Sequence, residues 1–242
     1  MPTGCGRHFR LFYNNTLILS AYLPEMMTIF YCYDAYCGWC YGFSPVIKRI
    51  AEEYKDKIFF EVLSGGMIIP ERPQPISTMA GYISKAYKVV EERTGIKFGS
   101  DFLWHINNPD DSDWFLNSEK PAIAMCVFKE YYPEKQVAFA ADLQYALNFE
   151  GRDLCDDEAY RHLLEQYNIP AEAFYASLHS EAYKEKAYYE FALCKQLQVT
   201  GFPAVLLQAS ESKFYLLARG FTEYDALKER IEAVLQEVAK TS

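Results

Sequence analysis

Two cysteines separated by two residues, Cys37 and Cys40, lie where a short apolar segment gives way to a helical pattern. Residues 27–33 are rich in aromatic and β-branched side chains, which is typical of a buried strand. Within residues 43–54, apolar side chains recur every three or four positions, as they do on one face of a helix. Residues 58–63 form a second apolar strand pattern. This part of the chain is therefore predicted to be a strand–helix–strand unit with the cysteines at the start of its helix.

The position of Cys37 at a helix start suits thiol–disulfide chemistry. A helix N-terminus presents unpaired N–H groups and the positive end of the helix dipole, and both stabilise a thiolate. We expect Cys37 to be exposed, to have a lowered pKa and to act as the nucleophile, while Cys40 resolves the mixed disulfide. Gly38 and Trp39 are expected to tune the reduction potential. A zinc half-site and an inert pair of thiols are the alternatives, and no metal is expected because zinc generally takes four ligands.

The rest of the chain divides into a helical block and a second strand-rich segment. Helical patterns follow the second strand at residues 76–93, 119–131, 135–149, 156–167, 170–179 and 181–197. Residues 100–117 lack a clear period and are predicted to be a loop or a short helix. Two apolar runs at 204–208 and 213–217 predict a hairpin, and the apolar positions of 227–238 predict a last helix. This order fits one small mixed sheet with helices on both faces.

A candidate substrate-binding loop directly precedes the third predicted strand and consists of Gly201, Phe202 and Pro203. Proline has no N–H for a sheet ladder, so Pro203 is expected at the first residue of the strand. The Phe202–Pro203 bond is a candidate for a cis peptide, with an ordinary trans bond as the alternative. In this position the loop can face Cys37 and offer the backbone of Phe202 to an extended substrate.

Taken together, these motifs resemble the DsbA-like branch of the thioredoxin superfamily. Residues 33–45, with the sequence YDAYCGWCYGFSP, resemble its predicted protein-disulfide isomerases, which are related to FrnE-like proteins. The segments 63–66, 145–153 and 200–203 fit the same subgroup. The resemblance implies an α/β, thioredoxin-like fold (βαβ … ββα) with a large all-helical insertion. It also implies disulfide exchange with Cys37 as nucleophile, Cys40 as resolving thiol and Pro203 as a cis proline opposite them.

The resemblance also implies a domain organisation. Residues 26–66 and 198–242 are predicted to form the thioredoxin-like domain, and residues 67–197 an inserted helical subdomain. A groove is expected between the two. Residues 1–25 are an N-terminal extension for which no structure is predicted.

One departure from the family pattern leaves a step of the chemistry open. Thioredoxins and DsbA carry a buried carboxylate six residues before the first cysteine, where this chain has Tyr31. The candidates for the proton acceptor of Cys40 are therefore Asp34, a water molecule and the Tyr31 hydroxyl. Two other functions are also open. One is a glutathione-dependent enzyme of the kappa-transferase or isomerase kind, against which the second cysteine argues, and the other is a non-catalytic binding module. No resident cofactor is expected, with glutathione as a candidate co-substrate.

Charge and cysteine usage limit the partners and the compartment. The net charge is −9 and no stretch is dense in Lys or Arg, which argues against nucleic acid and anionic membranes as partners. No segment is long and apolar enough to span a bilayer. The cysteine count of seven is odd, and residues 1–25 are not a convincing leader peptide, so a reducing cytoplasm is expected. The expected partners are a protein or small-molecule disulfide or dithiol and an unidentified reductase or oxidase.

The cysteines outside the pair are expected to be inert. Cys32 lies on the first predicted strand, too far from Cys37 for a disulfide. Cys126 and Cys194 fall in helical, apolar surroundings and are predicted to be core residues. Cys155 follows a turn and precedes two aspartates, so it is expected to be exposed and held as a thiol by the negative charge.

Overall fold

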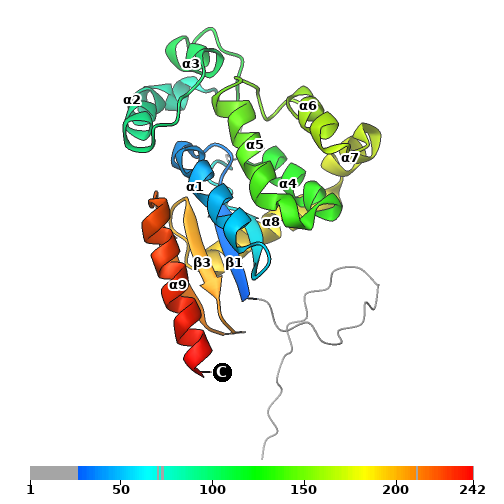
Figure 1. Cartoon of the computed structure of the whole chain (residues 1–242). Coiled ribbons are helices and arrows are strands. Elements are labelled where there is room, and N and C mark those ends of the chain that lie inside the picture. Colours follow the sequence, from blue (N-terminus) through cyan, green and yellow to red (C-terminus); the bar gives the residue numbers. More distant parts are fainter. Residues whose placement is uncertain (1–26, 70, 72–73, 211, 242) are drawn as a thin grey trace, which may run out of the picture.

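A mixed four-stranded sheet forms the centre of the molecule (Figure 1). The computed structural model describes residues 27–69, 71, 74–210 and 212–241, so the predicted extension 1–25 lies outside the described residues. The strands are β1 (Met27–Tyr33), β2 (Ile58–Ser64), β3 (Ala204–Gln208) and β4 (Phe214–Arg219), in the spatial order β2-β1-β3-β4. β1 pairs with β2 in parallel, whereas the pairs β1–β3 and β3–β4 are antiparallel. The predicted hairpin is confirmed as β3 and β4.

The helix that follows β1 runs from Gly38 to Tyr54 (α1) and contains Pro45. Phe43, Ile47 and Ile50 of its predicted apolar face are fully buried, whereas Val46 is partly buried. The last helix, α9 (Tyr224–Thr241), packs against α1 and β4. These contacts complete one side of a single large core.

Among the described residues between β2 and β3 there are seven α-helices and one short 3-10 helix (Pro133–Lys135), which supply the predicted all-helical insertion. The α-helices are α2 (Ser77–Thr94), α3 (Ser100–Asn107), α4 (Glu119–Tyr131), α5 (Gln136–Asn148), α6 (Glu158–Tyr167), α7 (Ala171–Leu178) and α8 (Glu181–Gln196). Each predicted helical pattern corresponds to one of them, and α3 lies in the stretch for which a loop or short helix was expected. The predicted fold class, an α/β thioredoxin-like fold with a helical insertion, is confirmed.

Two of these helices pack directly against the sheet. α5 and α8 both contact β2, and α1 contacts α5 (Figure 1). The division of the chain into a thioredoxin-like domain and a subdomain at 67–197 stays a prediction. Within that division α8 belongs to the insertion by sequence, yet it covers one face of the sheet.

The outer edge of β2 is covered by side chains from the helices. The Val62 N–H donates to Gln136 Oε1 at 2.9 Å, and the Ser64 N–H donates to Glu190 Oε2 at 2.9 Å. Lys129 Nζ donates to the Val62 carbonyl and lies 2.6 Å from both Glu61 Oε1 and Glu190 Oε1. An uncovered strand edge invites pairing with another chain, so these contacts protect the edge while they attach α4, α5 and α8 to it.

No helix within the described part of the chain is long and apolar enough to span a membrane.

Candidate active site

Cys37 occupies the N-cap position of α1, as the sequence predicts. Its backbone is extended (φ −82°, ψ 104°), and its Sγ accepts a hydrogen bond from the Cys40 N–H at 3.3 Å. The Cys37 N–H donates to the Asp34 carbonyl at 3.1 Å, which closes the turn that leads into the helix. Both cysteines are free thiols. The first turn of α1 therefore already directs an N–H at the sulfur of Cys37, the arrangement that stabilises a thiolate.

Contrary to our expectation, Cys37 is not exposed. Only 6% of its surface is accessible, and Cys40 is fully buried. The Cys37 thiol lies 3.6 Å from the Phe202 carbonyl oxygen, so the loop before β3 covers it. Burial raises the pKa of Cys40 well above its ordinary value, and the hydrogen bond and nearby charge of Cys37 add to this shift. Cys40 is therefore held as a thiol behind Cys37. Of the two cysteines, only Cys37 lines the neighbouring cavity that is described below.

The loop that contains Phe202 lies opposite the cysteines. The Phe202–Pro203 peptide bond is cis, and the Pro203 carbonyl accepts a hydrogen bond from the Gly220 N–H at 2.7 Å. The Phe202 ring lies against Gly65, where an added Cβ would come within 1.9 Å of it. Gly201 has open space around it, with nothing within 4 Å of the corresponding position. The Phe202 carbonyl thus lies next to Cys37, and the Phe202 ring packs against Gly65.

A cavity of about 510 Å³ opens beside Cys37. Four of the predicted site residues line it, namely Cys37, Gly38, Trp39 and Phe202, whereas Cys40, Gly201 and Pro203 do not. Much of the remaining wall comes from apolar residues of the insertion, including Ile68, Ile76, Met79, Ile83, Phe98 and Phe102. Among the described residues that line this cavity, none has a charged side chain. We call this cavity the Cys37 groove, and its chemistry suits an apolar group.

A buried carboxylate three residues before Cys37 holds the site together. Asp34 Oδ1 accepts hydrogen bonds from the Tyr36 N–H at 3.0 Å and the Ser118 hydroxyl at 2.9 Å. Asp34 Oδ2 accepts one from the Met67 N–H at 2.7 Å. Burial raises the pKa of Asp34, and these hydrogen bonds oppose that shift. The Asp34 carboxylate therefore joins the cysteine loop to the segment after β2 and to the start of α4, and its oxygens are already occupied by donors.

Tyr31 stands at the position where thioredoxins and DsbA carry a buried carboxylate. Its ring packs on Tyr33 and Phe43, and its hydroxyl is buried with no hydrogen-bond partner among the described residues. Burial raises the pKa of the Tyr31 hydroxyl, and the nearby thiols Cys40 and Cys37 raise it further. The Tyr31 hydroxyl is thus kept protonated close to the cysteine pair.

The remaining cysteines differ in part from the sequence expectations. Cys155 is only partly exposed; its thiol lies 3.0 Å from the Phe115 carbonyl, to which it donates, and 3.4 Å from the Tyr36 hydroxyl. Burial, more than the neighbouring aspartate, raises the pKa of Cys155. Cys126 is buried as predicted, but it donates to Glu190 at 3.5 Å rather than packing among apolar groups alone. No sequence pattern indicates these contacts, because the partners are far apart along the chain.

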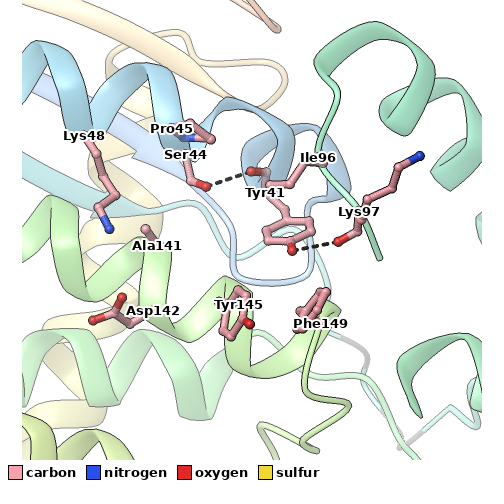
Figure 2. A pocket seen from close by; sticks show the side chains of 10 residues that line it. All are labelled: Tyr41, Ser44, Pro45, Lys48, Ile96, Lys97, Ala141, Asp142, Tyr145 and Phe149. Atoms are coloured by element: carbon pink, nitrogen blue, oxygen red, sulfur yellow. Dashed lines mark hydrogen bonds between the residues drawn. The ribbon is translucent and has the colours of Figure 1, made fainter. Parts of the chain in front are cut away.

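A second cavity of about 530 Å³ lies between α1, α5 and the segment at residues 96–97 (Figure 2). The Tyr41 hydroxyl donates to the Lys97 carbonyl at one side of it, and the rings of Tyr145 and Phe149 stack at the other with centroids 4.7 Å apart. Neither Cys37 nor Cys40 lines this cavity. It is therefore separate from the thiol chemistry.

Comparison with solved structures finds several proteins of similar fold. A candidate protein disulfide isomerase from Nitrosomonas europaea is 25% identical, with a TM-score of 0.76 over 88% of this chain and 99% of that chain. The cytosolic disulfide reductase DsbM from Pseudomonas aeruginosa is 25% identical, with a TM-score of 0.71 over 86% of this chain and 98% of that chain. DsbM with GSH gives a TM-score of 0.69 at 24% identity, over 86% and 99% of the two chains.

The fold is also shared with 2-hydroxychromene-2-carboxylate isomerase, at 13% identity and a TM-score of 0.61 over 89% of this chain and 100% of that chain. No curated protein matches the sequence. Residues 28–232 match the family model of the DSBA-like thioredoxin domain, which spans the sheet, the cysteine pair and the helical insertion. The chain therefore belongs to the DSBA-like thioredoxin domain family.

Proposed function

We propose that the protein is a thiol–disulfide oxidoreductase or isomerase that acts through Cys37 and Cys40. The observation that carries the proposal is the position of Cys37 Sγ. It lies at the N-cap of α1, 3.3 Å from the Cys40 N–H nitrogen and 3.6 Å from the Phe202 carbonyl oxygen, on the wall of an apolar groove. One sulfur thus combines a thiolate-stabilising helix end, an adjacent second thiol and a surface for substrate.

The proposed reaction proceeds in two exchanges. The Cys37 thiolate attacks one sulfur of a substrate disulfide, so a Cys37–substrate disulfide forms and the other substrate sulfur leaves as a thiolate. Cys40 then loses its proton and attacks Cys37, which releases the second substrate thiolate and leaves a Cys37–Cys40 disulfide. Two electrons have passed to the substrate, and an external dithiol, a reductase partner or glutathione returns them. The two substrate thiolates take up the protons that Cys37 and Cys40 have lost, so atoms and electrons balance.

The other site residues have supporting roles in this proposal. Gly38 and Trp39 tune the reduction potential and form the groove wall next to Cys37. Gly201, Phe202 and Pro203 hold an extended substrate, with the Phe202 backbone against the reacting sulfur. When Cys40 reacts, the buried Tyr31 hydroxyl donates a hydrogen bond to its sulfur, because the Asp34 oxygens are already engaged.

The groove favours a disulfide that carries apolar groups next to its sulfurs, such as a segment of an unfolded protein. A glutathione-dependent activity is the second candidate, and the solved complex of DsbM with GSH favours it. Glutathione has two carboxylates and an ammonium group, whereas the described lining of the Cys37 groove has no charged side chain to pair with them. We therefore assign glutathione the role of a co-substrate that reduces the enzyme. The cytoplasm is the proposed compartment, which the name of the cytosolic DsbM and the odd cysteine count support.

Trapping with Cys40→Ser tests the proposed function. We expect the variant to accumulate a stable mixed disulfide between Cys37 and a protein substrate with scrambled disulfides, because the resolving thiol is gone. Non-reducing electrophoresis and mass spectrometry of the Cys37 peptide detect the adduct. Full turnover of Cys40→Ser with glutathione would instead support the glutathione-dependent enzyme, and no adduct and no turnover would support the binding module.

Gly65→Ala tests whether the Phe202 loop contacts substrate. The new Cβ would come within 1.9 Å of the Phe202 ring, so the ring must leave its place in the groove wall. We expect kcat/KM for a protein disulfide to fall by about 10- to 100-fold, since small displacements of positioning groups have effects of this size. Gly81→Ala is the matched control because nothing lies within 4 Å of its added Cβ. An unchanged kcat/KM in a folded Gly65→Ala variant would contradict the assigned role of the loop.

A further inference from the structure

A second pair of thiols lies on the face of the sheet opposite the cysteine pair of the active site. Side chains alternate along a strand, so Cys32 points away from its neighbours Tyr31 and Tyr33. Tyr31 packs against Phe43 of α1, on the side of the sheet where Cys40 lies. Cys32 therefore faces the other side, where it meets Cys194 in the last turn of α8.

The two thiols are enclosed together. Cys32 is fully buried and Cys194 is 2% exposed, and both belong to one small cluster with Leu63, Ala204 and Leu206. The Cys194 thiol donates to the Ser64 carbonyl at 3.6 Å, which turns it toward the sheet. A hydrogen bond between the side chains of Cys194 and Cys32, followed by burial, raises the pKa of Cys194. The two side chains thus lie together in one buried cluster, although 161 residues separate them in the chain.

Neighbouring cysteines do not share this arrangement. Cys126 is also buried and lies near α8, but its thiol donates to Glu190. Cys155 donates to the Phe115 carbonyl. Among the described cysteines outside the active site, Cys32 and Cys194 are therefore the two that share one small buried cluster, and both are free thiols.

We propose that Cys32 and Cys194 are a second dithiol of this protein, which a low-molecular-weight disulfide such as glutathione disulfide oxidises to a structural Cys32–Cys194 disulfide. In the first step one protein thiolate attacks glutathione disulfide, and a protein–glutathione disulfide and one glutathione thiolate result. In the second step the other protein thiolate attacks the sulfur of the protein cysteine that carries glutathione, and the second glutathione leaves as a thiolate. One glutathione disulfide is consumed, two glutathione molecules form, and the two thiol protons pass to the leaving thiolates.

The consequence of this disulfide is a covalent link between β1 and α8. The cluster that holds the pair is bordered by Leu197, Val199 and Phe202, which belong to the segment leading to the Phe202 loop. The link would therefore attach the end of the helical insertion to the sheet next to the Phe202 loop, which covers Cys37. A cross-link that closes so long a loop restricts the unfolded chain strongly, so the oxidised protein is expected to be the more stable form.

Stepwise oxidation of the full chain tests the proposal. On titration with glutathione disulfide, we expect a fast loss of the two thiols of Cys37 and Cys40 and a slower loss of two more, because the second pair is buried. Peptide mapping without reduction then shows a peptide that links Cys32 to Cys194. The slow phase is expected to raise the thermal midpoint by about 5–10 °C.

Two variants and one direct observation decide the outcome. Cys194→Ala is expected to lose the slow phase and the rise in midpoint while the fast phase remains, and Cys126→Ala is the matched buried control that keeps both phases. The wild-type peptide map needs no variant to fold. Absence of the linked peptide after exhaustive oxidation, or a slow loss of two thiols that persists in folded Cys194→Ala, would overturn the proposal. The fast phase reports on the active-site pair alone, so the two proposals fail separately.

Discussion

Replacing Cys37 with serine is expected to lower the rate of disulfide exchange by at least about 10³-fold, the scale on which removal of a catalytic nucleophile acts. The serine hydroxyl is not ionised at neutral pH and does not form a disulfide. Cys40 cannot take over, because it is fully buried and its pKa is raised by that burial and by the contact with Cys37. Turnover of a protein disulfide, with a thiol as the terminal reductant, measures the effect.

A matched control separates loss of the nucleophile from loss of a thiol. Cys155→Ser removes a partly exposed cysteine outside the Cys37 groove, and a serine there can still donate to the Phe115 carbonyl. This variant should retain the wild-type rate. Circular dichroism should show both variants folded. A Cys37→Ser protein that retains more than about a tenth of the wild-type rate would mean that another thiol carries the reaction.

Lys129→Met is expected to lower the free energy of unfolding by about 3–5 kcal/mol, the range found when one partner of a buried ion pair is removed. The Lys129 side chain is 5% exposed and lies between Glu61 and Glu190 at 2.6 Å from each. The carboxylates explain why the pKa of Lys129 is raised even though its burial acts in the opposite direction. Methionine would leave the Glu190 carboxylate buried without a cation and the Val62 carbonyl without its donor. Equilibrium denaturation in urea measures the loss.

The double variant Lys129→Met with Glu190→Gln distinguishes an uncompensated charge from a packing defect. Glutamine is neutral and can still accept the hydrogen bond from the Ser64 N–H. We expect it to restore part of the stability lost in Lys129→Met, and a double-mutant cycle gives the coupling directly. Lys55→Met, which breaks an exposed pair with Glu52, should have little effect. A loss in Lys129→Met as small as that in Lys55→Met would show that the helices do not depend on this network.

Local patterns predicted the elements that form the site. The strand–helix–strand unit, the N-terminal position of Cys37 and the hairpin after Pro203 depend on residues close together in the chain, where periodicity and turn chemistry are informative. The same holds for the helices from α4 to α8. The short α3 (Ser100–Asn107) escaped a firm prediction because the stretch 100–117 lacks a clear helical period.

Contacts between distant residues could not be predicted in this way. Lys129 meets Glu61 across 68 positions and Glu190 across 61, and a charge on a helix is ordinarily expected in solvent. The burial of Cys37 depends on Phe202, 165 positions away. Asp34 was a candidate proton acceptor for Cys40, but its carboxylate is engaged by Tyr36, Met67 and Ser118, two of which come from other parts of the chain. Tertiary structure alone brings these groups together.

In the proposed function, Cys37 and Cys40 form a reversible disulfide that exchanges with substrates. The most direct test of this proposal is equilibration of the protein in glutathione buffers of graded redox poise, followed by thiol alkylation and mass analysis of the peptide that contains both cysteines. We expect one two-electron transition at that peptide in the wild-type protein and none in Cys37→Ser. A midpoint near −270 mV would indicate a reductase and one near −120 mV an oxidant, roughly the values of thioredoxin and DsbA. A peptide that stays fully reduced or fully oxidised across the whole series would show that Cys37 and Cys40 do not form a reversible disulfide.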